Sequence, residues 1–353
     1  MIRHRLPRVA LIIVNWNSWR DSLECLESVF RLDYLEYLTV LVDNGSTDDS
    51  LQRIRKWCQG KSPRAGRRLM LYTAAEAERG GQPSAERKIT GWPSSQRLVL
   101  IDIGENLGFA EGNNVAFRYL LQSTWKPDFF FLLNNDAKIE KKCLFHAVSL
   151  AERSRAGVIG ARILDAEGRS VIFAGDYRRP EFFFRKNRKQ PEWMSEDRPS
   201  IQALGSGMLI SREALLAHQK RYGHFFNPQL FMYGEETEFC LDLLKISYKI
   251  LISEQAVVCH KGGQSVEAAD RNPMQLYYMT RNSIAIARKT LSLGWLLFFH
   301  LIYAPVRLRM ALSHILQGEG NATRAILQGI RDGYLGRLGK WRHHPHRQTR
   351  GRG

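Results

Sequence analysis

Residues 38–49, LTVLVDNGSTDD, indicate the fold most directly, because an apolar run of strand length ends there in a polar turn. The run Leu38–Val42 is followed at once by Asp43, and a glycine two residues later permits a tight turn. The next residues, Asp49–Trp57, carry apolar side chains at three- and four-residue spacing, and Thr47 is a suitable N-cap before them. The stretch therefore predicts a buried strand, a turn and a helix in succession.

The same alternation continues on both sides of this stretch. Further apolar runs of strand length lie at Val9–Val14, Leu98–Ile103 and Phe129–Leu133, and helix-like spacing occurs in Trp19–Arg31 and Phe109–Gln122. Runs that are apolar throughout are typical of strands buried on both faces. Strand–helix alternation predicts a mostly parallel sheet flanked by helices, with ligands bound beyond the carboxyl ends of the strands.

Composition narrows the class of protein. The chain has 353 residues, of which 44% are hydrophobic and 25% charged, which excludes a disordered chain and a bundle of membrane spans. The five cysteines are scattered and contain no C-x-x-C pair, so we expect a reducing compartment without a disulfide framework or a zinc knuckle. The first apolar run is only six residues long and has no cleavage site after it, so we expect no signal peptide.

The net charge of +17 is concentrated in two segments, residues 60–97 and residues 271–353. The first carries 8 basic and 3 acidic side chains and has no sustained period beyond Leu69–Tyr72, so we interpret it as an inserted surface segment or a mobile loop. The second carries 14 basic and 2 acidic side chains. Such basic segments favour anionic partners, and the rest of the chain is neutral.

Residues 290–306 contain no Lys, Arg, Asp or Glu. A spanning helix needs about 20 apolar residues, and this run includes His300 and Pro305, so we expect an interfacial or re-entrant helix rather than a span. The flanking arginines and lysines would add attraction to anionic lipid. An ordinary buried helix followed by a disordered basic tail is the alternative.

Polar clusters follow the strand runs. Asp43 can accept hydrogen bonds from a nucleobase or a ribose, and residues 105–114, ENLGFAEGNN, suit close backbone approach to a nucleotide. The apolar run at 129–133 delivers Asn134, Asn135 and Asp136, and a divalent cation that bridges a diphosphate would satisfy these polar groups. Each cluster could instead be a turn or a helix cap. Neither G-x-G-x-x-G nor a P-loop motif is present.

A fourth cluster places Glu235, Glu236 and Glu238 at the start of a predicted helix. The helix dipole explains one or two acidic residues better than a cluster that repels itself, so one carboxylate could be a general base toward an acceptor hydroxyl. His260 ends a later apolar run, where it could complete a metal site or be purely structural.

Taken in order, these segments resemble glycosyltransferase family 2, a group of GT-A fold enzymes, and in particular its rhamnosyltransferase-like members that act on bacterial polysaccharides. The resemblance covers about residues 8–290. It rests on the following segments: Ile13–Ser18, Val42–Asp48, Asn106–Asn114, Leu133–Asp136, Gly205–Ile210, the acidic cluster and His260.

The resemblance implies roles for individual residues. Asp43 would contact the nucleobase, Asp136 would be the last carboxylate of a DxD-like metal motif, and His260 would approach the metal or the diphosphate. Family members commonly have Glu-Asp where this chain has Glu235-Glu236, so the base is expected at Glu236, with Glu235 as the alternative. The remaining expected nucleotide contacts are Asn15, Asn17, Asn44, Asn106, Gly108, Phe109, Gly112, Asn113 and Asn135, and the expected donor and acceptor pocket contains Gly205, Ser206, Gly207 and Tyr233.

The implied reaction is inverting transfer of a sugar from dTDP-rhamnose or a UDP-sugar, with Mg²⁺ or Mn²⁺, to a saccharide or lipid-linked acceptor. We expect a cytoplasmic protein, peripheral on the inner face of the membrane, whose partners include an anionic membrane surface but no nucleic acid. We expect a GT-A domain at residues 1–270, which divides into a nucleotide-binding half at 1–136 and an acceptor half at 137–270. A helical segment at 271–330 and a basic tail at 331–353 are expected to follow. A catalytically silent assembly factor of the same fold is the main alternative; a nucleic-acid-binding protein and a sugar nucleotidyltransferase are less consistent with the motifs.

Overall fold

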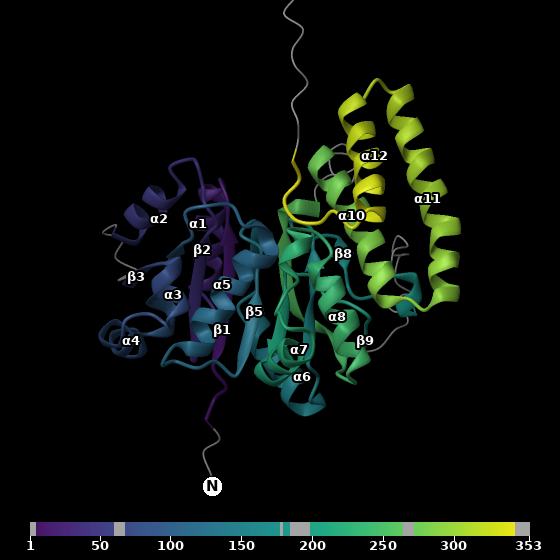
Figure 1. Ribbon diagram of the computed structural model, residues 1–353. Helices are drawn as coiled ribbons and strands as arrows, with labels where there is room; N and C mark the ends of the chain where they lie inside the picture. The colour runs from purple at the N-terminus through teal and green to yellow at the C-terminus, as the bar shows by residue number, and fades with distance from the viewer. Residues whose placement is uncertain (1–4, 60–67, 177–178, 184–197, 264–271, 343–353) are drawn as a thin grey trace, which may run out of the picture.

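The computed structural model describes residues 5–59, 68–176, 179–183, 198–263 and 272–342. One large sheet runs through the molecule, with strands in the order β3-β4-β2-β1-β5-β10-β7-β11-β6 and β8 and β9 attached to β7 and β11. Helices cover both faces, as the sequence predicts, and α10–α12 form an additional layer beside the sheet (Figure 1). The α/β prediction is therefore confirmed.

The first half of the sheet is entirely parallel. The predicted strand runs all form strands here, because their continuous apolar sequences suit burial on both faces. The strands of this half are β1 Val9–Asn15, β2 Tyr37–Asp43, β3 Arg68–Thr73, β4 Arg97–Asp102 and β5 Phe129–Leu132.

Residues 68–97 form regular elements, so the mobile-loop alternative for the 60–97 segment is wrong for them, while the inserted-segment alternative stays a prediction. β3 pairs in parallel with β4 at the edge of the sheet, and the short helices α3 Ala74–Glu78 and α4 Pro83–Thr90 follow it. An edge strand that is only partly buried needs less apolar sequence than a central strand, so its hydrophobic signal is weak. Residues 60–67 lie outside the described residues.

The second half of the sheet is mixed. β10 Met208–Ser211 runs antiparallel to both β5 and β7 Val158–Leu164, and β11 Ile250–His260 runs parallel to β7. This arrangement brings the start of β10 and the end of β11 to the same edge as the ends of β1, β2 and β5. The remaining strands are β6 Ala137–Ile139, β8 Val171–Phe173 and β9 Arg198–Pro199.

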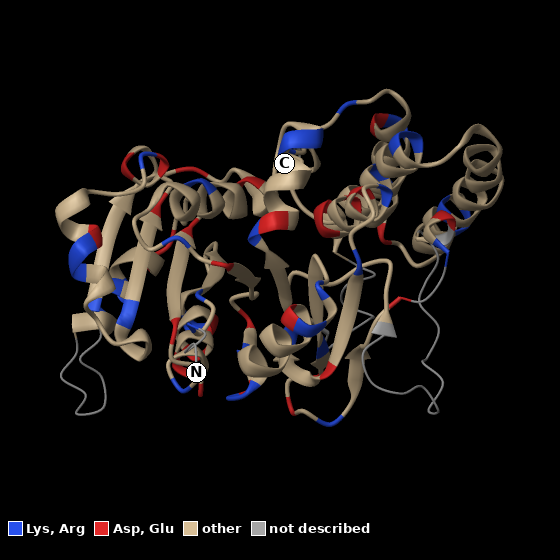
Figure 2. Ribbon diagram, turned by 90° about the horizontal axis from the view of Figure 1, so that it is seen from below, with Lys and Arg blue, Asp and Glu red and all other residues tan. Residues whose placement is uncertain are grey.

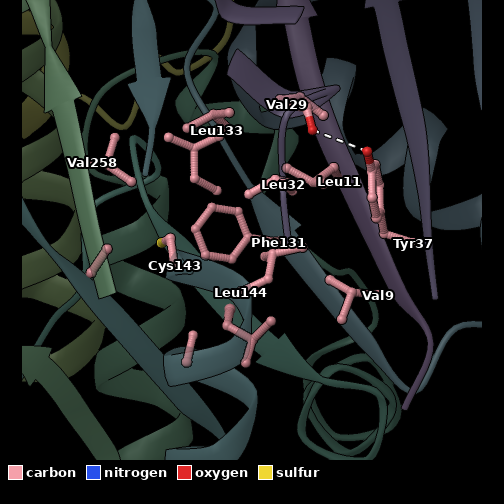
Figure 3. Packing of buried hydrophobic residues seen from close by; sticks show 14 of the residues in the cluster. Val9, Leu11, Val29, Leu32, Tyr37, Phe131, Leu133, Cys143, Leu144 and Val258 are labelled. Carbon is pink, nitrogen blue, oxygen red and sulfur yellow. Dashed lines mark hydrogen bonds between the residues drawn. The ribbon is translucent and has the colours of Figure 1, made fainter. Parts of the chain in front are cut away.

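Two hydrophobic cores lie on opposite faces of the sheet. One packs α1 Trp19–Val29, α2 Ser50–Gln59 and α6 Cys143–Ser154 against it, and Figure 3 shows the Phe131 ring at its centre. The other face is covered mainly by α5 Gly108–Gln122, α7 Arg212–Tyr222 and α8 Glu235–Lys245. The predicted cap at Thr47 is wrong, because α2 begins three residues later, where the Asp48 carboxylate accepts a hydrogen bond from the Ser50 amide.

The C-terminal unit consists of α10 Pro273–Thr290, α11 Leu293–Leu316 and α12 Gly320–Tyr334. Within the described residues, α11 is the one helix long and apolar enough to cross a membrane, and only 17% of its most apolar window is buried. In Figure 2 the blue ribbon segments mark Lys and Arg positions on this unit. The predicted start of the tail at residue 331 falls inside α12, which continues to Tyr334, and the Gly339 amide donates a hydrogen bond to the Gln229 carbonyl.

Candidate active site

The ends of β1 and β2 form a tightly bonded pair. Asp43 is 2% exposed, and its Oδ2 accepts hydrogen bonds from Asn15 Nδ2 at 2.8 Å and from Ser46 Oγ at 2.8 Å, while its Oδ1 accepts one from the Ser46 amide at 3.0 Å. Asn15 is fully buried. The Asn15 side chain thus helps to fix the orientation of the Asp43 carboxylate.

Asn17 organises the turn that follows β2. Its backbone is left-handed, with φ of 52°, and its Oδ1 accepts hydrogen bonds from the amides of Thr47 at 2.7 Å and Asp48 at 3.2 Å. Its side chain thus takes up two amides that would otherwise be open to a ligand at this turn. The structure gives Asn17 a supporting position beside the predicted nucleotide pocket.

A second loop, between β4 and α5, is held against β2 by Asn44. The Asn44 Nδ2 donates a hydrogen bond to the Gly108 carbonyl at 3.1 Å, and the Asn44 Oδ1 accepts one from the Leu107 amide at 3.1 Å. Gly108 has φ of +84°, and a Cβ there would lie 2.3 Å from the Phe231 carbonyl oxygen. A glycine is required here, because the loop between β4 and α5, which we call the nucleotide loop after its predicted role, and the loop before α8 touch through their backbones.

Other predicted residues of this loop are internal supports. Asn113 is 1% exposed and donates to the Phe109 carbonyl at 2.8 Å. Gly112 leaves room for the Val14 side chain, 3.1 Å from its Cβ position. Asn106 is more accessible, and its carbonyl oxygen lies 3.4 Å from Lys340 Nζ.

Asn135 connects the nucleotide pocket with the predicted metal loop. Its Nδ2 donates to Ser22 Oγ at 3.1 Å, and Ser22 Oγ donates in turn to Asn15 Oδ1 at 2.7 Å. Asn15 then bonds to Asp43. Asn135, which is partly exposed, is thus hydrogen-bonded to the network that supports Asp43.

Asp136 and His260 meet at the carboxyl edge, although 124 residues separate them. His260 Nε2 lies 2.9 Å from Asp136 Oδ1, and both side chains are partly exposed, at 17% and 29%. Asn134 Nδ2 is 3.1 Å from the same nitrogen, and Asn134 Oδ1 is a buried acceptor with no hydrogen-bond partner among the described residues. The predicted metal residues therefore converge.

This donor set fits a divalent cation that shares its shell with a diphosphate. Cis ligands of Mg²⁺ at about 2.1 Å lie about 3.0 Å apart, close to the spacing of the Asp136 and His260 donors. Carboxylate and amide oxygens suit Mg²⁺ or Mn²⁺, with the imidazole as a further donor. The protein alone is a sparse site, because no cluster of three or more His, Cys, Asp or Glu occurs within the described residues.

The two candidate bases have different environments. Glu235 is 2% exposed, and burial together with the neighbouring Glu236 raises its pKa well above the ordinary value. Glu236 is partly exposed, and its Oε1 accepts a hydrogen bond from the Gly205 amide at 3.1 Å. Burial raises the pKa of Glu236 as well, which strengthens it as a base. Glu236 is thus the more accessible carboxylate of the pair.

The predicted pocket residues surround Glu236 unequally. A Cβ on Gly205 would lie 2.7 Å from Glu236 Oε1 and 3.1 Å from the Phe109 ring, so this glycine keeps the acidic pair and the nucleotide loop together. Burial and the nearby carboxylates of Glu235, Glu236 and Asp136 raise the pKa of Tyr233. Tyr233 thus lies in the electrostatic range of these three carboxylates.

Two further predicted pocket residues face the sheet. Ser206 is 3% exposed and its Oγ has no hydrogen-bond partner among the described residues. Gly207 leaves room for the Ala161 side chain, 2.9 Å from its Cβ position. Both residues therefore support the start of β10 rather than line an open pocket.

Comparisons with known proteins agree with this geometry. The family model described as "Glycosyl transferase family 2" matches residues 10–68, which contain β1, β2 and the Asp43 turn. Over these residues the chain is similar to glycosyltransferase family 2. Two curated relatives of this glycosyltransferase-like chain are the low-salt glycan biosynthesis hexosyltransferase Agl10 of Haloferax volcanii and the dTDP-rhamnosyl transferase RfbF of Shigella flexneri.

The alignments to these relatives are partial. Agl10 is 30% identical over 161 residues, which are 44% of this chain and 50% of the relative. RfbF is 22% identical over 200 residues, or 55% of this chain and 64% of the relative. The glycosyltransferase-like chain thus spans between half and two thirds of the curated relatives that it matches.

Two solved structures share the fold over most of the chain. S. aureus TarS 1–349 in complex with UDP-GlcNAc has a TM-score of 0.54 and 15% identity, and covers 92% of this chain and 81% of its own. The mannosyltransferase PcManGT of Pyrobaculum calidifontis, in complex with GDP-Man and Mn²⁺, has a TM-score of 0.51 and 14% identity, with 95% and 89% covered. The GT-A type fold predicted for this glycosyltransferase-like chain is confirmed.

Proposed function

We propose that this chain transfers a sugar from a nucleoside diphosphate donor to a hydroxyl group of a saccharide or lipid-linked acceptor, with inversion at the anomeric carbon. The observation that carries the proposal is the convergence of three features at one edge of the sheet. These are the Asp43 pocket, the Asp136–His260 pair and the Glu235–Glu236 pair with one accessible carboxylate. The partial matches to hexosyltransferases support the same class of reaction.

In this reaction Asp43 and the loop that begins at Asn106 hold the nucleoside. Asp136 and His260, with the oxygen of Asn134, would hold Mg²⁺ or Mn²⁺, which neutralises the leaving diphosphate when bound. Glu236 takes the proton from the acceptor hydroxyl. The acceptor oxygen then forms its bond to the anomeric carbon while the bond from that carbon to the diphosphate oxygen breaks, and the nucleoside diphosphate leaves.

The acidic pair supplies a base of suitable strength. Burial beside Glu236 raises the pKa of Glu235 well above its ordinary value and favours its protonated form, and we assign the base role to the more accessible Glu236. The Gly205 amide donates to Glu236 and favours the charged form. The pair therefore carries one negative charge, placed on the carboxylate that is accessible.

Helix α11 supports a role at a membrane surface. Its buried side chains include Phe299, Tyr303 and His314, which pack toward the protein. A separate stripe of leucines is 52% to 75% exposed and falls within about 100° of the helix circumference. The stripe contains Leu293, Leu297, Leu301, Leu308 and Leu312.

We propose that this leucine stripe rests in the interface of an anionic membrane and that the protein is peripheral on its cytoplasmic face. Arg307 and Arg309 lie within α11, and Arg288 lies in the last turn of α10, so positive charge accompanies the apolar stripe. A helix with one face packed on its own protein and the other apolar suits an in-plane position better than a span. This position would present the active site to a lipid-linked acceptor.

The first experiment is calorimetric titration of UDP and dTDP, with and without Mn²⁺ or Mg²⁺, followed by transfer assays with the sugar donors of the nucleotide that binds. Metal-enhanced binding of one nucleotide and turnover of its sugar donor are expected. Folded protein that binds neither nucleotide would contradict the transferase proposal and favour a silent assembly factor. Cosedimentation with anionic vesicles tests the membrane proposal independently.

A further inference from the structure

The loop that leads into the acidic pair has an unusual backbone. Phe231, Tyr233 and Gly234 all have left-handed conformations, with φ values of 66°, 64° and 100°. For the two aromatic residues this conformation is unfavourable, and such strain persists only where the surroundings enforce it. The loop is therefore held in place by something outside itself.

Asn282, in the middle of α10, provides this restraint. The side chain is 1% exposed, and its Nδ2 lies 3.0 Å from the Leu230 carbonyl oxygen, 2.9 Å from that of Met232 and 2.6 Å from that of Tyr233. An amide nitrogen has two hydrogens, so all of its donor capacity is directed at this loop. Asn282 is 49 to 52 residues away from these carbonyls in the sequence.

The adjacent Arg281 fixes the orientation of Asn282. Arg281 is fully buried, and its Nε donates to Asn282 Oδ1 at 2.8 Å, which leaves Nδ2 as the end that faces the loop. The guanidinium also donates to the carbonyls of Leu230 at 2.8 Å and Gly339 at 2.5 Å. Burial of a cation costs free energy unless its hydrogen bonds are made, so the Arg281 guanidinium favours the one arrangement in which the Leu230 and Gly339 segments both offer it their carbonyls.

The restrained loop connects both halves of the site. The Phe231 carbonyl accepts a hydrogen bond from the Ala110 amide at 3.2 Å, so the loop also supports the start of α5. Glu236 follows Tyr233 by three residues and reaches Gly205. Any shift of the loop therefore moves the base relative to the nucleotide loop.

We propose that Asn282 is a positioning residue for glycosyl transfer. Its amide sets the Leu230–Tyr233 loop so that Glu236 and Tyr233 face the reacting groups, while donor binding depends on other residues. This inference rests on the proposed function. It makes the C-terminal helical unit part of the active site, in addition to its proposed contact with the membrane.

The test compares Asn282→Asp with the parent protein. The carboxylate keeps the size of the side chain and its contact with Arg281 but cannot donate to the three carbonyls. We expect kcat to fall by about 10²-fold, the loss typical of a reacting group displaced by about 1 Å. The nucleotide dissociation constant and the binding stoichiometry should stay within twofold of the parent values, whereas a merely structural role would lower the stoichiometry together with the rate.

Asn272→Ala is the matched control. Asn272 caps the same helix through the amides of Met274 and Gln275 but does not contact the loop, so its variant should keep the parent kcat. Asn282→Ser retains one hydrogen-bond donor, so its kcat should lie between those of Asn282→Asp and the parent. This variant replaces Asn282→Asp in the test if the Asp variant does not fold.

Two results would overturn the positioning role. One is a kcat for folded Asn282→Asp within twofold of the parent. The other is failure of both Asn282 variants to fold, which would make the role structural. Absence of transfer by the parent protein itself would instead contradict the proposed function.

Discussion

The acidic pair gives the sharpest test of the chemistry, because its two members are expected to respond differently to the same change. Glu236→Gln keeps the size of the side chain and leaves an amide oxygen that can still accept the Gly205 hydrogen bond, but it removes the base. Proton abstraction by a positioned group is typically worth about 10²- to 10⁴-fold in rate. We expect kcat to fall by that factor, which corresponds to about 3 to 5.5 kcal/mol of activation free energy.

Glu235→Gln is the matched control. Glu235 is 2% exposed and its Oε2 has no hydrogen-bond partner among the described residues, so its loss should leave most of the turnover. Its pKa is raised in the folded protein, so the folded state holds this proton more tightly than the unfolded state. Folding stability due to this group is therefore present below the unfolded pKa of about 4.3 and is lost as the pH rises toward the folded value. At neutral pH the Gln variant should be more stable than the parent.

The assay is release of nucleoside diphosphate from the donor, measured between pH 4 and 9, with calorimetric titration of nucleotide as the binding control. Because the pKa of Glu236 is raised, the parent kcat/KM should fall with decreasing pH at values above those of an ordinary glutamate, about 4.3. Parent-like turnover by Glu236→Gln would refute its role as base. An equal loss in both variants would refute the division of roles within the pair.

Three further outcomes are expected. Asp136→Ala should weaken nucleotide binding in the presence of Mn²⁺ but not in its absence, and coincident titrations of variant and parent would remove Asp136 from the metal site. Gly104 has φ of +81° and nothing near its Cβ position, so Gly104→Ala should lower the free energy of unfolding in urea by about 1–2 kcal/mol. Gly108→Ala should lower it further, because a Cβ there would lie 2.3 Å from the Phe231 carbonyl oxygen. Equal losses of stability in the two variants would argue against that close contact. Leu301→Ser, on the exposed stripe of α11, should reduce cosedimentation with anionic vesicles, whereas Leu35→Ser, at a site 79% exposed elsewhere, should not.

The central strands could be predicted from the sequence because they are apolar along their whole length. Val9–Val14, Leu38–Val42 and Phe129–Leu133 differ from the observed strands by one residue at most at either end. The edge strand β3 and the short antiparallel strands of the second half escaped prediction. These strands are short or only partly buried, and long-range pairing determines their position rather than local sequence.

The candidate site could be located for a similar reason. Asp43 and Asp136 follow strands that the sequence reveals, and parallel strands end at one edge. Asn282 gave no signal, because a single polar residue within a helical pattern shows nothing of what it contacts about 50 residues away. The predicted roles of Asn15, Asn113 and Asn135 as direct nucleotide contacts remain predictions, since the structure shows these side chains engaged in internal hydrogen bonds.

The contact between Arg281 and Gly339 bears on how the protein is made. The loop that positions the acidic pair lies at residues 230–233, yet the groups that hold it come from residues 281 and 282, and Gly339 bonds both Arg281 and the Gln229 carbonyl. During synthesis on the ribosome the sheet can therefore form before the loop has its final restraint. We expect a nascent chain that ends before Arg281 to be able to bind nucleotide but not to transfer sugar, so that the proposed activity begins only when the C-terminal helices have been synthesised.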